Sequence, residues 1–76
     1  MLVRQQIAGA RALLGWTRQN LSERSGVSLR TIARYESGEG DITTMKLAKL
    51  EDTLLSEGIR FVNGGVTSEA LKRPPL

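Results

Sequence analysis

The sequence contains no cysteine and no histidine. It therefore cannot form a disulfide, hold a metal through thiolate or imidazole, or build a catalytic nucleophile and base pair from these residues. Tryptophan, tyrosine and phenylalanine occur once each, so a hydrophobic core must be made mainly of aliphatic side chains. We expect no metal and no cofactor. The absence of cysteine agrees with a reducing compartment, which makes the cytoplasm the expected location.

Long apolar runs are absent too. The apolar residues near the N-terminus are interrupted by Arg4, Gln5 and Arg11, so no signal peptide is expected, and no stretch is long enough to span a bilayer. At 76 residues the chain has room for one domain, and such a fold buries only about 60% of the surface that its unfolded chain exposes. A large enzyme pocket is not expected, and the carboxylates show no paired catalytic arrangement.

Charge is unevenly distributed along the chain. Residues 1–38 contain six arginines and two glutamates, a net charge of +4, whereas residues 39–76 contain five basic and six acidic residues, a net charge of −1. Every basic residue of the first half is arginine, whose planar guanidinium suits phosphate and guanine better than the point charge of lysine. This asymmetry favours an anionic partner, although a basic face that serves only solubility explains the charge equally well.

Hydrophobic spacing and capping residues predict four helices, because apolar residues recur at the helical period and hydroxyl or glycine residues stand at the ends. The expected helices are Leu2–Leu14 before Gly15, Arg18–Ser25 between Thr17 and Gly26, Leu29–Ser37 between Ser28 and Gly38, and a fourth helix that follows Thr43 and ends at Gly58. In the fourth helix Leu47, Leu50 and Leu54 form an apolar stripe, with Met45 as a candidate further member.

The residues after Gly58 predict a strand. Residues 59–62 alternate as a half-buried strand does, and residues 63–65 are strong turn formers. A single strand leaves backbone groups unpaired, so either the chain from Val66 returns as a partner strand or the strand pairs with a second copy. The expected architecture is an all-α bundle of four to five short helices with a short C-terminal strand or hairpin, in one domain over residues 1–66, followed by a flexible tail over residues 67–76.

Five residues between positions 21 and 35 have the spacing of a helix-turn-helix. Leu21 faces inward from the first helix of the pair, Gly26 permits a sharp turn because it has no Cβ, and Val27 fills the gap between the helices. Ile32 and Tyr35 bury the inner face of the second helix. Two short helices joined by a glycine also occur in other all-α bundles, so the spacing alone leaves that alternative open.

The run from Thr17 to Gly38, TRQNLSERSGVSLRTIARYESG, resembles the DNA-binding domain of bacterial transcriptional regulators of the phage-repressor and Cro type. Its most specific part is the second helix of the pair, in which a hydroxyl cap is followed at fixed spacing by Thr, Ile, Glu and Gly. The resemblance extends more loosely from the first expected helix to Phe61. It implies a compact bundle whose third helix enters the DNA major groove.

The resemblance also implies a set of DNA-contacting residues. Arg30 and Arg34 are four residues apart and share a helix face, while Ile32 and Tyr35 point the other way. Arg30 is the candidate for a bidentate contact to guanine and Leu29 for an apolar contact to a thymine methyl group, with a purely solvated helix face as the alternative. The expected DNA-binding residues are Thr17, Arg18, Gln19, Ser28, Leu29, Arg30, Thr31 and Arg34.

Five positions depart from the pattern of these regulators. Arg18 stands where they usually have glutamine, so it can bind phosphate but could lose a side-chain hydrogen bond that orients the residue opposite. Ser22 and Ser25 stand where small apolar or aliphatic residues are usual. Both are small enough to pack, and each hydroxyl can bond to a carbonyl one turn earlier. After the third helix, Glu39 and Asp41 occupy a loop that is often basic, where they would repel phosphate.

The resemblance further implies an ion pair between Arg11 and Glu36 that locks the first helix onto the third. Two unrelated surface charges are the alternative, because the residues are far apart in sequence. The role of such a pair would be structural rather than DNA-contacting.

Two functions from different classes remain. The first is a sequence-specific, repressor-like regulator that binds double-stranded DNA at an operator-like, palindromic site through residues 28–37. The second is a protein-interaction module of the same fold, such as the antitoxin of a toxin–antitoxin pair. Because one recognition helix reads too few base pairs to find an operator, we expect a homodimer with Ile59, Phe61 and Val62 in the interface. No membrane partner is expected.

Overall fold

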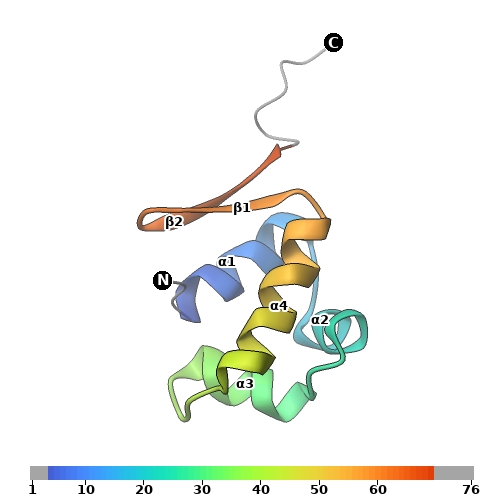
Figure 1. Ribbon diagram of the computed structural model, residues 1–76, viewed down its shortest axis with the longest axis vertical. Helices are drawn as coiled ribbons and strands as arrows, with labels where there is room; N and C mark the ends of the chain where they lie inside the picture. Colours follow the sequence, from blue (N-terminus) through green and yellow to red (C-terminus); the bar gives the residue numbers. More distant parts are fainter. Residues whose placement is uncertain (1–3, 70–76) are drawn as a thin grey trace.

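The computed structural model describes residues 4–69, which form four helices followed by a two-stranded antiparallel hairpin (Figure 1). The elements are α1 (Arg4–Leu14), α2 (Arg18–Ser25), α3 (Leu29–Ser37), α4 (Thr44–Ser56), β1 (Ile59–Val62) and β2 (Gly65–Ser68). This architecture confirms the expected helical bundle with a C-terminal hairpin. Leu2 and Val3, expected in the first helix, lie outside the described residues.

Hydroxyl side chains cap the N-termini of three helices. The Thr17 hydroxyl accepts from the backbone N–H of Asn20 at 3.0 Å, while the Asn20 side chain accepts from the backbone N–H of Thr17 at 3.0 Å. Ser28 and Thr43 cap α3 and α4, each accepting from a backbone N–H three residues later at 3.2 Å. A cap of this kind contributes about 1 kcal/mol to helix stability, so these local signals set the helix starts.

The turn between α2 and α3 is closed by Gly26 and two serines. Gly26 has a φ of 78°, in the left-handed region that a residue with a Cβ adopts only at a cost. The Ser22 hydroxyl donates to the carbonyl of Val27 at 2.7 Å, and the Ser25 hydroxyl accepts from its N–H at 3.1 Å. The two hydroxyls therefore do not form the bonds to carbonyls one turn earlier that were open to them. Both hydroxyls instead satisfy the backbone of a residue whose side chain is buried between the helices.

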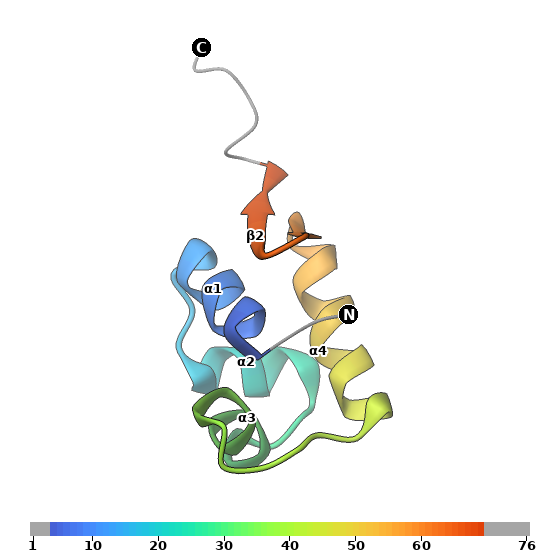
Figure 2. The same cartoon turned by 90° about the vertical axis from the view of Figure 1, so that its left-hand side faces the viewer.

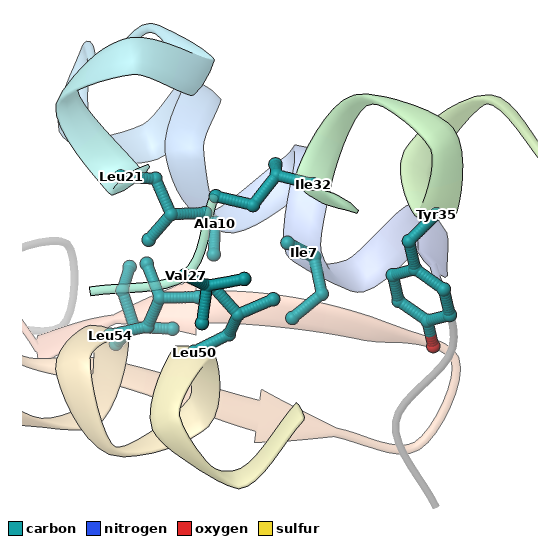
Figure 3. Packing of buried hydrophobic residues seen from close by; sticks show 9 residues of the cluster. Ile7, Ala10, Leu21, Val27, Ile32, Tyr35, Leu50 and Leu54 are labelled. Atoms are coloured by element: carbon teal, nitrogen blue, oxygen red, sulfur yellow. The ribbon is translucent and has the colours of Figure 1, made fainter. Parts of the chain in front are cut away.

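The core lies where the four helices meet the hairpin, and Figure 3 shows side chains from all four helices pointing toward one another. Its buried members are Ile7, Ala10, Leu21, Val27, Ile32, Tyr35, Leu50, Leu54 and Ile59. Leu47 packs at the edge of this cluster. Met45 is 71% exposed, so the prediction that it belongs to the apolar stripe is wrong. At about 100° per residue, Met45 lies roughly 140° around α4 from Leu50 and points away from the core.

The two strands pair with each other in one chain, in a register that places Val62 opposite Gly65. Of the two alternatives for the strand, the structure therefore contains the hairpin. The buried side chain of Gln6 in α1 anchors the tip of the hairpin, because its Nε2 donates to the carbonyls of Val62 at 2.9 Å and Gly65 at 2.8 Å. β2 extends to the buried Ser68, so two residues of the expected tail belong to the hairpin, and residues from 70 on lie outside the described part.

α3 and the hairpin lie at opposite ends of the molecule. Figures 1 and 2 agree in placing α3 at one end of the long axis and the strands at the other, with α1 and α4 running between them. The outer face of α3 is therefore well separated from the hairpin.

Candidate nucleic-acid interface

The two faces of α3 differ sharply in burial. Ile32 and Tyr35 are 0% and 7% exposed, whereas Arg30 and Arg34 lie on the exposed face. Leu29, at the first position of the helix, is 41% exposed. The helix is thus anchored to the core by one face and presents an apolar group and two guanidinium groups on the other. This is the arrangement that a helix needs in order to enter a groove without losing its packing.

The smaller predicted residues lie at the starts of α2 and α3 and already take part in bonds within the chain. Thr17 caps α2, and the exposed Gln19 donates to Glu23 at 3.1 Å. The Ser28 hydroxyl donates to the hydroxyl of Thr31 at 2.8 Å while capping α3. These contacts hold the hydroxyl groups in fixed positions next to the first turns of the two helices.

The two arginines on the outer face of α3 differ in what surrounds them. Among residues 4–69, the side chain of Arg30 has no hydrogen-bond or ion-pair partner, so its guanidinium is available to a ligand. Arg34 instead lies against the loop after α3, where a Cβ built on Gly40 would be 3.4 Å from its Nη2 atom. Arg30 is therefore the better placed of the two for a contact outside the chain.

The loop after α3 carries the acidic residues that were expected to repel phosphate. Asp41 lies 3.9 Å from a terminal nitrogen of Arg4 and its side chain is fully exposed. Arg4 also lies over the ring of Tyr35, with its guanidinium carbon 5.1 Å from the ring centroid. An exposed ion pair at this distance contributes little to stability. Asp41 and the exposed Glu39 therefore present negative charge to solvent near Arg34.

Glu36 is the centre of a charged cluster that joins three helices. Arg11 of α1 donates from Nε to Oε2 at 2.8 Å and from Nη2 to Oε1 at 2.7 Å. Arg18 of α2 donates from Nε to the same Oε1 at 2.9 Å. The side chains of Glu36, Arg11 and Arg18 are 1%, 17% and 42% exposed. The expected pair of Arg11 and Glu36 is present, and Arg18 is a second partner of Glu36 that was not expected from the sequence.

The two arginines decide the ionisation of this buried carboxyl group. Burial by itself raises the pKa of Glu36, but the hydrogen bonds and positive charges of Arg11 and Arg18 outweigh it and lower the pKa below its ordinary value. The carboxylate is therefore charged at neutral pH. One negative charge between two guanidinium groups leaves the cluster with a net charge of +1, and its most exposed member is Arg18.

Two other kinds of site are absent from the described residues. No group of three or more acidic side chains in this part of the chain is arranged to hold a metal ion. None of the helices over residues 4–69 has the length and apolar character needed to cross a membrane.

Comparison with known proteins defines the class. A family described as helix-turn-helix matches residues 7–55, which covers most of α1 and all of α2 and α3, and extends nearly to the end of α4. The chain belongs to this helix-turn-helix family, which agrees with the resemblance to phage-repressor and Cro-type regulators. Over 54 residues, 71% of the chain, it is 33% identical to the transcriptional repressor RstR of the cryptic phage CTXphi from Vibrio cholerae serotype O1. The chain spans about half (48%) of the length of that relative.

Proposed function

We propose that the chain regulates transcription by binding double-stranded DNA in a sequence-specific manner, with α3 in the major groove. The observation that carries this proposal is the division of α3 into a buried face, with Ile32 and Tyr35, and an exposed face with Leu29, Arg30 and Arg34. The major groove has the width to admit an α-helix. The relative is described as a phage repressor, which supports repression by occupying an operator. The proposed location is the cytoplasm, which agrees with the absence of cysteine.

The exposed residues divide into base-reading and phosphate-binding roles. Arg30 reads guanine through two hydrogen bonds, and Leu29 contacts a thymine methyl group. Phosphate oxygens are bound at the start of α2, by Thr17, Arg18 and Gln19, and at the start of α3, by Ser28 and Thr31, with Arg34 at the outer edge. Phosphate contacts of this kind fix the register of the helix in the groove, and base contacts then select the sequence.

A symmetric dimer completes the proposal, because two copies read two half-sites about one helical turn apart. The proposed contact is the hairpin surface, where Val62 is 45% exposed and Phe61 is half-buried. Ile59, also expected there, is 0% exposed and belongs to the core of a single copy, so it is not part of the proposed contact. The hairpin lies at the end of the molecule opposite α3 (Figure 1), so a contact there leaves the reading helix free.

Selection of bound sites from random duplex DNA tests this function. A palindromic consensus supports both sequence-specific binding and the dimer. A selection that enriches no sequence, repeated at low salt, would overturn the proposal. A consensus without internal symmetry would support sequence-specific binding but would contradict the proposed symmetric dimer.

The second candidate, a protein-interaction module such as an antitoxin, is favoured by exposed apolar side chains outside α3. Met45 at the start of α4 and Val62 in the hairpin are 71% and 45% exposed. The two functions differ in salt dependence, because DNA affinity that depends on phosphate contacts falls steeply with salt and an apolar protein interface does not. A partner bound equally well at low and high salt through Met45 favours this candidate.

A further inference from the structure

Arg18 is held by Glu36 through only part of its guanidinium group. Its Nε donates to the carboxylate at 2.9 Å, and no other bond to an acceptor is made by its side chain within residues 4–69. The Glu36 side chain is 1% exposed, whereas that of Arg18 is 42% exposed. A guanidinium carries its five donors in one rigid plane, so fixing Nε also fixes the plane of the terminal amino groups. Those amino groups remain available to a second acceptor outside the chain.

The carboxylate that holds Arg18 is itself fixed. Arg11 binds both oxygens of Glu36 and also donates from Nη1 to the carbonyl of Trp16 at 2.9 Å. Glu36 belongs to α3 and Arg18 is the first residue of α2. The guanidinium at the start of α2 is therefore positioned relative to α3 by a hydrogen bond rather than by the flexible side chain alone.

We propose that Glu36 is a positioning residue for nucleic-acid binding, holding Arg18 through Nε so that its terminal amino groups bind a backbone phosphate of duplex DNA while α3 lies in the groove. The inference rests on the proposed DNA-binding function. An arginine held in its bound geometry loses less conformational entropy on binding than a free one. Arg18 also lies at the start of α2, the positive end of the helix dipole, which favours an anion at this position.

Positioning and simple charge predict opposite effects of Glu36→Gln. The substitution removes a negative charge next to the binding surface, so if Arg18 acts only through its charge, DNA affinity rises. If Glu36 positions Arg18, affinity falls, because a neutral amide is a weaker acceptor than a carboxylate. Glu39→Gln is the matched control. It removes the same charge from an exposed residue three positions later, and we expect it to strengthen binding.

The experiment measures fluorescence anisotropy of a labelled mixed-sequence duplex, about three helical turns long, titrated with the full chain and its variants at several KCl concentrations. We expect Glu36→Gln to weaken binding about tenfold and to lower the salt slope by about one unit, the amount of one phosphate contact. In an Arg18→Ala background the same substitution should no longer weaken binding, because the side chain that Glu36 positions is absent. Tighter binding by Glu36→Gln, or an equal loss with and without Arg18, overturns the positioning role.

Arg18→Lys provides a test that leaves Arg11 and Glu36 paired, in case Glu36→Gln fails to fold, which circular dichroism at the assay temperature detects. Lysine keeps the charge, but its single ammonium group cannot reproduce the two-sided geometry of a guanidinium. We expect Arg18→Lys to bind nearly as weakly as Arg18→Ala, and wild-type affinity of this variant overturns the inference. A wild-type chain that binds no duplex overturns the DNA function itself, which distinguishes that failure from the loss of the positioning role alone.

Discussion

Arg11 and Glu36 are 25 positions apart in sequence, yet their side chains form two parallel hydrogen bonds of 2.8 and 2.7 Å. The pair connects α1 to α3 beside the core, where Glu36 is almost completely removed from water. Because breaking such a pair leaves a charge with little solvation, its loss costs more than the loss of a surface ion pair. The pair therefore belongs to the tertiary structure that holds α3 in place against α1.

The first prediction concerns the stability of this cluster. Arg11→Ala and Glu36→Ala should each lower the free energy of unfolding by more than the ~0–1 kcal/mol of a surface pair. Glu36→Ala should cost more, because it leaves two arginines without their partner, whereas Arg11→Ala leaves Arg18 bound to Glu36. Urea denaturation of both variants and of the double variant measures the coupling. Purely additive losses would show that the contact contributes nothing.

The second prediction is a pH dependence of stability. The pKa of Glu36 is lower in the folded chain than in the unfolded one, so the unfolded chain binds more protons in the intervening range. Stability from this group is therefore fully present above the ordinary value of 4.5 and is lost as the pH falls through the lowered value. Urea denaturation across this acidic range should give a shallower pH dependence for Glu36→Gln than for the wild type. Identical profiles of stability against pH for the two proteins would contradict the lowered pKa of Glu36.

The third prediction concerns base recognition. Arg30→Ala should cost roughly 1–3 kcal/mol of binding to the selected site and relax the choice at one base pair, the usual effect of losing a bidentate guanine contact. Arg60→Ala is the matched control, because it removes the same charge from the hairpin, where Arg60 pairs with Glu69. Site selection with both variants makes the comparison. An unchanged consensus for Arg30→Ala would mean that α3 does not recognise a base in the groove through this residue.

The fourth prediction concerns the anchor of the hairpin. Gln6→Ala removes the donor that binds the carbonyls of Val62 and Gly65, so it should lower the free energy of unfolding by about 1–3 kcal/mol. It should also speed amide hydrogen exchange in β1 and β2 more than in α2 and α3. Gln5→Ala, a change of the exposed neighbouring residue, serves as the control and should have little effect. Equal effects of the two substitutions would exclude a specific anchor.

The fifth prediction concerns the proposed dimer. Val62→Asp places a charge on the exposed hairpin surface without touching the core, so it should convert a dimer to a monomer in sedimentation at micromolar concentration without DNA. Met45→Asp, an equal change on an exposed residue of α4, is the control. Sedimentation of the wild-type chain as a monomer would contradict the proposed hairpin contact. A dimer could then form only on DNA.

The starts of α2, α3 and α4 and the ends of α2 and α3 could be predicted because their causes are local, whereas α4 ends at Ser56, before the expected Gly58. Thr17, Ser28 and Thr43 each bond to a backbone N–H three residues later, and Gly26 and Gly38 adopt positive φ values directly after α2 and α3. None of these contacts depends on how the helices pack, so the sequence pattern contained the complete reason for each. The buried face of α3, with Ile32 and Tyr35, was predictable for the same reason, since the helical period alone places these two residues on one side of the helix.

Sequence by itself thus determined the four helices, the turn between α2 and α3, and the two faces of α3, because capping and periodicity act over a few residues. Only the tertiary structure decided that the strand closes on its own chain and that Ile59 lies in the core. It also decided that Arg18 shares the carboxylate of Glu36 with Arg11. These outcomes depend on distances between residues remote in sequence, which packing of the helices establishes and no local pattern encodes.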